Sequence, residues 1–398
     1  MSPPPLSPIL AGEPGRARPI RFETISERDG LAARADEWDA LVSTTSRQSP
    51  FFSTPWLLAW WRHHGQERAM RIEIALDGDR LVGGLPLEVE RTRMGSRVAH
   101  FMGRHHAPLA DVLVADDCDE LAIGRALVER AGTGGTDFGD FFGVAHDSVL
   151  ARVAGSDATL VERIEAPFID LARGWDEIYG ERTSSKRRNL HRRRRRQLGE
   201  LGELSIEIAR DEDDLAAALD AAFRLHELRW EGRSDGSEFT TAVGKAFHRE
   251  AVRALGARDM ARILTMRLDG VPIAFHYWIQ YAGCMYVHRL AFDPAFAKHS
   301  PGLIATLDAI ESAEQEGAGR VEFLGGGERY KLELADATAP LYQCIGFATT
   351  LRGRAGVSAA RAAIAVHMRL RRSERARSLY LRAGRFQRRP ESDSNSVL

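Results

Sequence analysis

The sequence of 398 residues contains little cysteine, and its three cysteines, Cys118, Cys284 and Cys344, are scattered without a CxxC pair. This scarcity excludes a disulfide scaffold and a structural zinc site, and it fits a reducing compartment. No apolar run approaches the roughly 18 residues that a membrane-spanning helix requires. Residues 1–20 lack an apolar core followed by a cleavage site, which predicts a flexible leader rather than a signal peptide. We therefore expect a cytoplasmic protein.

The charge of the chain is nearly balanced in total but strongly segregated along the sequence. The formal net charge is −1, yet residues 182–196 hold nine Lys and Arg residues and no acid. Residues 350–398 hold twelve Arg against three acidic residues. The remainder of the chain is therefore acidic, and the two basic segments are where anionic partners would bind. A hydrophobic content of 44% otherwise indicates a globular protein long enough for two or three domains.

The sequence repeats itself weakly. "LDGDRLVGGLPLEV" at 76–89 resembles "LDGVPIAFHYWI" at 268–279, and each is typical of two strands joined by an Asp-Gly turn. In each half a further strand, a helix and a short strand before glycine then follow in the same order. This order predicts two copies of one α/β unit. The second copy carries an insertion with the arginine run and two helical patterns between 213 and 255.

The helix expected after Ser300 begins in an unusual way. Ser300 is a good N-cap whose hydroxyl can accept from a backbone N–H, and Pro301 suits the first helical position. Gly302 is costly inside a helix, unless something must approach the backbone closely there. Exposed N–H groups at a helix start suit a phosphate, although an ordinary capped helix is the alternative. The corresponding helix of the first copy follows several carboxylates, which would repel a phosphate, namely Asp116, Asp117, Asp119 and Glu120.

The motifs of the chain, taken together and in order, resemble a known family. They are "FFSTPWLLAWW" (51–61), "LVGGLPLEV" (81–89), "LHELRW" (225–230), "FHRE" (247–250), "DGVPIAF" (269–275), "AFDPAFAKHSPG" (291–302) and "FLGGGERYK" (323–331). This order is similar to that of the GNAT-type acetyltransferases of the cellulose-biosynthesis (CelD) group, over roughly residues 35–350. The resemblance implies an α/β (α+β) fold of tandem GNAT-like domains, each a mixed, mostly antiparallel sheet flanked by helices, related to Fem-type aminoacyl transferases. It also implies acyl transfer from acetyl-CoA or another acyl-CoA. The common phosphate-loop pattern, Arg/Gln-x-x-Gly-x-Gly/Ala, is absent, and "HSPGLI" stands in its place.

The resemblance also implies roles for particular residues. The pyrophosphate would lie against Ser300, Pro301, Gly302 and Leu303. Arg229 would contact a phosphate or the substrate, with a surface salt bridge as the alternative. Direct transfer needs a base for the acceptor and often an acid for the departing thiolate. The base candidates are Glu328, Glu322, His276 and His288, and the acid candidates are Tyr330 and Tyr286. The two histidines could lie close together in a hairpin, but no third ligand accompanies them at metal spacing, so we expect no metal.

Two basic segments remain. The arginine run predicts a helix from Ser184 with only Leu190, Leu198 and Leu201 to bury. Arg192–Arg196 could hold a polyanion, or the helix could be a solvated cover on the acidic body. Aromatic residues are not interleaved and no DNA-reading motif is present, which argues against stacking on single strands and against sequence-specific DNA binding. Residues 355–389 predict an Ala/Arg helix that could lie on an anionic membrane surface, pack on the body or stay disordered.

These observations give one leading hypothesis and two rivals. The leading hypothesis is a cytoplasmic acyl-CoA-dependent N- or O-acyltransferase that acts on a small-molecule or carrier-linked acceptor. Polysaccharide or envelope metabolism is a possible setting, and peripheral contact of the tail with the inner membrane face is a further possibility. The rivals are a Fem-type transferase that uses aminoacyl-tRNA and a non-catalytic accessory protein of exopolysaccharide synthesis. The expected divisions are a leader 1–20, an N-terminal domain 21–165, a catalytic domain 166–350 with a basic insertion 182–200, and a tail 351–398.

Overall fold

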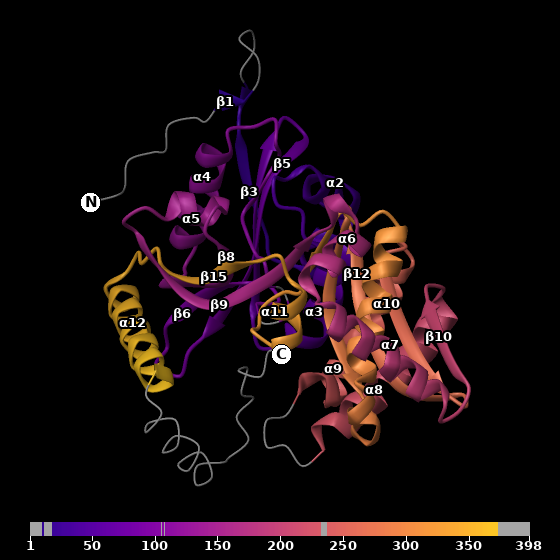
Figure 1. Ribbon diagram of the computed structural model, residues 1–398. Helices are drawn as coiled ribbons and strands as arrows, with labels where there is room; N and C mark the ends of the chain where they lie inside the picture. The colour runs from indigo at the N-terminus through magenta and orange to yellow at the C-terminus, as the bar shows by residue number, and fades with distance from the viewer. Residues whose placement is uncertain (1–9, 12–17, 105, 107, 232–236, 373–398) are drawn as a thin grey trace.

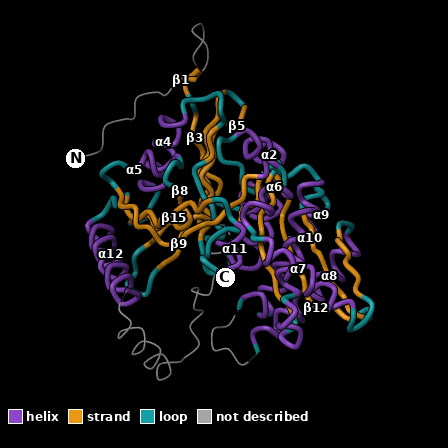
Figure 2. The backbone as a smooth tube through the Cα atoms, in the orientation of Figure 1, coloured by secondary structure: helices purple, strands orange, loops and turns teal. Residues whose placement is uncertain are grey.

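The computed structural model describes residues 10–11, 18–104, 106, 108–231 and 237–372. Most of its strands belong to one sheet in the order β10-β11-β12-β13-β14-β9-β15-β8-β6-β5-β4-β3, with β7 beside β5. Figure 2 shows the strands as a continuous band through the molecule, with helices on its outer sides. The expected α/β fold of two GNAT-like units is confirmed by this sheet.

The N-terminal half is the first unit. Its strands are β3 (Arg21–Ile25), β4 (Ala69–Asp77), β5 (Arg80–Arg91), β6 (Arg97–Phe101), β7 (Leu113–Val114) and β8 (Phe138–Ala145). Its helices are α1 (Arg28–Ala33), α2 (Ala35–Thr44), the 3-10 turn η1 (Pro50–Phe52), α3 (Thr54–His64), α4 (Glu120–Thr133) and α5 (Val149–Ala154). β3 to β6 are antiparallel neighbours, and β8 returns after α4 to run parallel with β6.

The C-terminal half repeats this order. Its strands are β10 (Leu204–Ala209), β11 (Ala261–Leu268), β12 (Val271–Tyr281), β13 (Cys284–Phe292) and β14 (Arg320–Glu322). Its helices are η2 (Leu171–Arg173), α6 (Trp175–Arg182), α7 (Ser185–Gly199), α8 (Glu212–Trp230), η3 (Glu238–Thr240), α9 (Ala242–Gly256), η4 (Pro294–His299), α10 (Pro301–Gln315) and α11 (Arg329–Leu334). β10 to β13 are antiparallel, and β14 returns after α10 parallel to β13. Asp269 and Gly270 both have positive φ, as a tight hairpin turn requires.

Two long strands join the halves. β9 (Ala158–Asp170) follows the N-terminal half but pairs with β14 of the C-terminal half. β15 (Ala337–Gly346) follows the C-terminal half but pairs with β8 of the N-terminal half, and β9 and β15 pair with each other. Both run across the middle of the molecule (Figure 1). The division expected at residues 165 and 166 falls inside β9, which pairs with β14 on one side and with β15 on the other.

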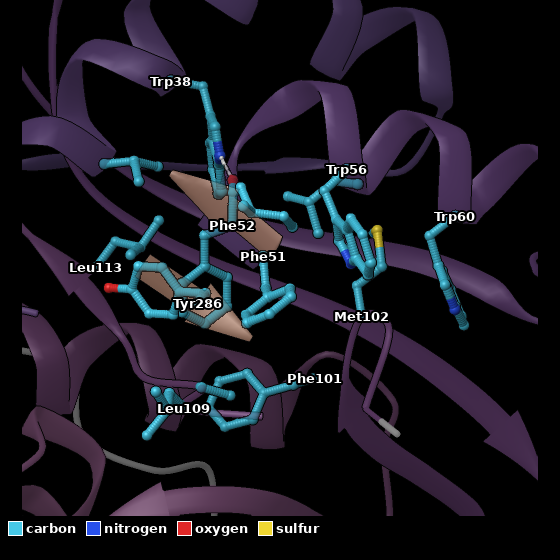
Figure 3. Packing of buried hydrophobic residues seen from close by; sticks show 14 of the residues in the cluster. Trp38, Phe51, Phe52, Trp56, Trp60, Phe101, Met102, Leu109, Leu113 and Tyr286 are labelled. Carbon is cyan, nitrogen blue, oxygen red and sulfur yellow. Dashed lines mark hydrogen bonds between the residues drawn. The ribbon is translucent and has the colours of Figure 1, made fainter. Parts of the chain in front are cut away.

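Aromatic side chains fill the contact between the halves. The Trp38 indole N–H donates to the carbonyl of Phe52 over 2.7 Å, which fixes α2 against η1. Tyr286, from β13 of the C-terminal half, lies among these N-terminal rings, 6.0 Å from the ring centre of Phe51 (Figure 3). Trp56 of α3 meets Phe247 of α9 edge to face at 5.0 Å. The halves therefore share one apolar core.

The two basic segments form helices. α7 begins after Ser184, whose hydroxyl accepts from the backbone N–H of Arg187, as the sequence predicts. Leu198 is buried, whereas Leu201 is half exposed and lies beyond the helix end, so its expected burial was wrong. The tail forms α12 (Leu351–Arg372), which starts earlier than expected and buries Val357 against the sheet. The rest of the expected tail helix, 373–389, lies outside the described residues.

Among the residues that the structure describes, every helix is too short or too polar to cross a bilayer.

Candidate active site

The two parallel strands of the C-terminal half separate soon after they meet. β13 and β14 are paired at three positions, from Cys284 opposite Arg320 to Tyr286 opposite Glu322. β13 then continues to Phe292, while the chain after β14 turns away through Leu324 and Gly326, both at positive φ. Neither strand uses the other for its backbone hydrogen bonds beyond this point in the described chain. Separated parallel strands leave donors and acceptors free for a ligand.

A β-bulge stands at the separation. Tyr277 pairs with Arg289 and Trp278 pairs with Val287, so His288 is left without a partner on β12. An extra residue of this kind frees a backbone group and re-aims its side chain. The His288 ring is surrounded by rings of Trp56, Tyr277 and His248, at centroid distances of 5.2, 5.0 and 5.2 Å. His288 therefore faces α3 and α9.

α10 begins next to the separated strands. The helix starts at Pro301 as the sequence predicts, but Ser300 adopts a left-handed conformation and its hydroxyl makes no capping bond among the described residues. The predicted side-chain cap was therefore wrong. A Cβ on Gly302 would lie 2.8 Å from Cδ1 of Phe292, so the close approach at this glycine comes from the Phe292 ring. The N–H groups of Leu303 and Ile304 donate to the Ser300 carbonyl over 3.1 and 3.2 Å, which leaves the Gly302 N–H without a backbone acceptor among the described residues. A free N–H at a helix start suits an anion.

The corresponding region of the N-terminal half differs in two ways, at the start of its helix and between its strands. Asp119 accepts from the backbone N–H of Ala122 and caps α4 with a carboxylate. Between β6 and β8, His100 Nδ1 lies 2.7 Å from the carbonyl oxygen of Asp140, and its Nε2 lies 2.9 Å from Arg104. These side chains fill the position that follows the last paired residues of β6 and β8. The C-terminal half is therefore the better candidate for a ligand.

Basic residues border the start of α10. α7 lies beside α10 and η4, and Arg195 forms an ion pair with Asp308 of α10. Arg187 at the other end of α7 bonds to Glu333 of α11 over 2.8 Å. Within the described chain no ion pair engages Arg193 or Arg194. α7 thus packs on the acidic body through some of its arginines, and its other arginines add positive charge near the start of α10.

Several predicted residues lie on the α10 side of β12 and β13. Lys331 is buried, with Nζ 3.0 Å from Glu328 Oε2 and 3.3 Å from the Gly325 carbonyl oxygen. Burial lowers the pKa of Lys331 and raises the pKa of the neighbouring Tyr330 phenol. Arg229 lies over the Phe292 ring at 5.0 Å, next to the start of α10. This side of the sheet thus holds most of the predicted site residues, namely Ser300, Pro301, Gly302, Leu303, Arg229, Glu328 and Tyr330.

Other candidates lie elsewhere. Tyr286 is directed toward the N-terminal half, where its hydroxyl donates to the carbonyl of Gln48 over 2.7 Å. Glu322 is bonded to Arg320 over 2.6 Å, and burial raises its pKa. His276 lies on the α10 side, near Trp278, whereas His288 lies on the α9 side. The expectation that these two histidines meet in the hairpin was wrong, because the bulge and the alternation of strand side chains send them to opposite faces.

A polar cluster on the α9 side was missed by the sequence reasoning. Glu238 Oε1 lies 3.1 Å from His64 Nε2, and Glu238 Oε2 pairs with His106 Nε2, so both halves contribute. Burial lowers the pKa of His64 to about 4. Trp60 donates its N–H to His106 Nδ1 over 3.2 Å, which places the His106 proton on Nε2, toward Glu238.

Ligand atoms of these three residues lie within 4.8 Å of one another, a spacing that a metal would accept. The protonated Nε2 of His106 does not suit metal ligation, so we describe the group as a hydrogen-bonded His–Glu cluster. The only sequence signals for this cluster were the pairs His63-His64 and His105-His106.

The match to a known protein family is confined to the C-terminal half. Residues 185–332 match the family described as "Acetyltransferase (GNAT) domain", a stretch that runs from α7 into α11. Comparison with curated protein sequences gives no match. Residues 185–332 are thus similar to a GNAT acetyltransferase domain.

Solved structures resemble the chain over both halves. FemX has 10% identity and a TM-score of 0.56, covering 81% of this chain and 96% of that one. L-PGS from Bacillus licheniformis has 12% identity and a TM-score of 0.50, covering 81% and 95%. The C-terminal domain of a putative lysylphosphatidylglycerol synthetase from Agrobacterium fabrum has 12% identity and a TM-score of 0.50, covering 79% and 91%. At sequence identities this low, the similarity shows a shared fold and nothing about activity.

Proposed function

We propose that the chain is an acyltransferase that takes an acyl group from acetyl-CoA or another acyl-CoA and passes it directly to an amine or hydroxyl. The observation that carries this proposal is the uncapped start of α10 beside the separated strands β13 and β14. In the N-terminal half Asp119 and His100 fill the equivalent positions. The motif order of the CelD group supports a role in polysaccharide or envelope metabolism.

The residues present fit such a co-substrate. The N–H group of Gly302 suits a phosphate of the pyrophosphate, and α7 supplies positive charge beside it. The bulge leaves His288 unpaired with β12, and the chain turns away from β13 at Leu324 and Gly326, so the backbone there suits the amide chain and the thioester carbonyl. The thioester supplies the acyl group. Glu328, held by buried Lys331, and Tyr330 are the polar groups of the α10 side that can move a proton there.

The test is a calorimetric titration of acetyl-CoA and free CoA into the wild type and into Ser300→Asp. Aspartate tolerates the left-handed conformation of Ser300 and would copy the acidic cap of the N-terminal half. We expect wild-type binding and a loss of at least about tenfold in Ser300→Asp, because a carboxylate would occupy the phosphate position. Ser300→Asn has nearly the same shape without the charge and should stay within about threefold of wild type. No wild-type binding, or equal binding by Ser300→Asp, would overturn the proposal.

A Fem-type transferase that uses aminoacyl-tRNA is the second candidate. Arg193 and Arg194 of α7, which have no ion-pair partner in the described chain, favour it. It predicts tRNA binding that weakens steeply with salt, no affinity for CoA, and a shallower salt dependence in Arg193→Gln/Arg194→Gln. Retention of CoA binding together with salt-insensitive or absent tRNA binding would exclude this candidate.

A further inference from the structure

α7 presents an exposed row of cations on the surface of the C-terminal half. On its inner side Leu198 is buried in the core, whereas Lys186, Arg192 and Arg193 are exposed. Within the described chain no ion pair engages these three side chains. Lys186 and Arg193 are seven positions apart, which is about two turns and roughly 10 Å along the helix axis. The outer side of α7 is therefore a rigid line of positive charge that the protein itself does not neutralise.

This row lies beside the start of α10. α7 contacts both η4 and α10, and Arg195 pairs with Asp308 of α10. Lys298, exposed near the end of η4, adds a further cation next to the helix start. The helix start itself offers one N–H without a backbone acceptor in the described chain, that of Gly302. One such group suits one phosphate, so the charge on α7 extends well beyond what a single phosphate requires.

The borders of the row favour a protein as its partner. Leu201, which directly follows α7, is 50% exposed. Leu332 of α11 is 39% exposed and is next to Glu333, which Arg187 contacts at the other end of α7. An acidic protein surface gains from both the cations and the leucines, whereas a nucleic acid backbone gains mainly from the cations. The row therefore fits an acidic helical protein better than it fits RNA.

We propose that α7 docks an acidic acyl carrier protein, whose phosphopantetheine thioester reaches the start of α10 and serves as an acyl donor alongside acyl-CoA. The inference rests on the proposed function, because it places the thioester at the same helix start. The phosphopantetheine arm is the group that CoA also contains, and on a carrier it ends in one phosphodiester rather than a pyrophosphate. A single phosphate matches the single free N–H of Gly302. Charge complementarity between α7 and the carrier would supply orientation and a fast encounter.

The transfer step is the same for either donor. The acceptor oxygen or nitrogen forms a bond to the thioester carbonyl carbon, and the carbon–sulfur bond breaks. The proton that the acceptor loses is in net terms passed to the thiol of the phosphopantetheine. The products are the acylated acceptor and the holo carrier, and no further reactant is needed.

The experiment measures the affinity of the full chain for a bacterial acyl carrier protein in its apo and holo forms, by fluorescence anisotropy of the labelled carrier. We expect the holo form to bind more tightly, because only it has the phosphopantetheine arm. Binding should weaken at least about tenfold between about 50 mM and about 300 mM salt, since the charges are exposed. Lys186→Glu/Arg193→Glu should weaken binding of the holo carrier at least about tenfold more than it weakens binding of CoA.

Two further variants separate docking on α7 from other effects. Arg354→Glu/Arg361→Glu changes the net charge equally at exposed positions of α12, which Figure 1 shows on the other side of the molecule. This matched control should leave the affinity for the carrier within about twofold of wild type, because charges so far away are screened. Ser300→Asp should remove the advantage of the holo over the apo carrier, since its carboxylate would occupy the phosphate position.

Absent binding of the holo carrier, equal affinities for the apo and holo forms, or equal weakening by the two double variants would overturn the inference. Binding of tRNA that Lys186→Glu/Arg193→Glu abolishes, without binding of the carrier, would overturn it in favour of the Fem-type candidate. If acetyl-CoA binds the wild type and not Ser300→Asp, a missing or unspecific carrier contact leaves the proposed function standing. Failure of both CoA and the carrier to bind removes both.

Discussion

At the scale of single residues, Gly302 shows how packing and function share one position. The glycine leaves room for the Phe292 ring, which in turn lies under Arg229. The bare backbone at the start of α10 is therefore required by the core, whether or not a phosphate binds there. Ser300 is left-handed and its hydroxyl makes no capping bond among the described residues, so the Gly302 N–H has no backbone acceptor there.

We expect Gly302→Ala to destabilise the protein by about 1–3 kcal/mol, because the new methyl group must displace the Phe292 ring. The measurement is urea unfolding followed by tryptophan fluorescence. Gly180→Ala in α6 is the control, since a Cβ there meets nothing within 4 Å. That change should stabilise by about 0.5–1 kcal/mol through helix propensity. Equal effects at the two positions would mean that the Phe292 contact is unimportant.

At the scale of elements, α12 packs on the sheet through few side chains. Val357 is 6% exposed and joins Val98, Phe138 and Ile345 in a small cluster at the far side of β6, β8 and β15. Ile364, further along the helix, is partly buried against the same cluster. The apolar side of the first part of this helix is thus already covered by the protein.

Val357→Asp should therefore destabilise the fold by about 2–4 kcal/mol, because it places an unpaired carboxylate in an apolar cluster. Val366→Asp, on the same helix at 55% exposure, should change stability by less than about 0.5 kcal/mol. Thermal unfolding by circular dichroism compares the two. A neutral Val357→Asp would show that α12 does not dock on the sheet in solution.

At the scale of the whole molecule, buried histidines make the fold sensitive to acid. Burial lowers the pKa of His226 and of His276 to about 3, and it also lowers the pKa of His248 and His288. In the unfolded chain these groups take up protons near pH 6.5, whereas in the folded chain they do not. Their stabilisation is therefore complete above pH 6.5 and is lost as the pH falls toward 3. Glu88 and Asp111, whose pKa values burial raises to about 7 and about 6, oppose this trend. Burial also raises the pKa of Asp140, Asp308 and Glu322, which act in the same direction.

We expect the melting temperature to fall steadily between pH 7 and pH 4. Each fully buried histidine contributes about 1.4 kcal/mol per pH unit in this range. His276→Leu removes one such group and should flatten the pH dependence by about that slope. The measurement is the melting temperature of the wild type and of His276→Leu at several pH values between 7 and 4. Parallel curves for wild type and variant would show that His276 takes up its proton in the folded state.

The sequence by itself determined the repeated unit and its elements. Asp-Gly turns, alternating strands and the Ser184 and Pro301 helix starts are local signals, and each led to the right element. The contrast between Asp119 and Ser300 could likewise be seen in the sequence, since a carboxylate next to a helix start acts locally. These predictions hold because hydrogen bonding and steric preference over a few residues decide them.

Only the tertiary structure decided which side chains meet. The bulge at His288 depends on pairing between β12 and β13, and it is what separates His288 from His276. The exchange of β9 and β15 between the halves, and the meeting of His64 and His106 with Glu238, join residues more than 100 positions apart. Such contacts depend on strand register and on the docking of helices over the sheet, which no short stretch of sequence encodes.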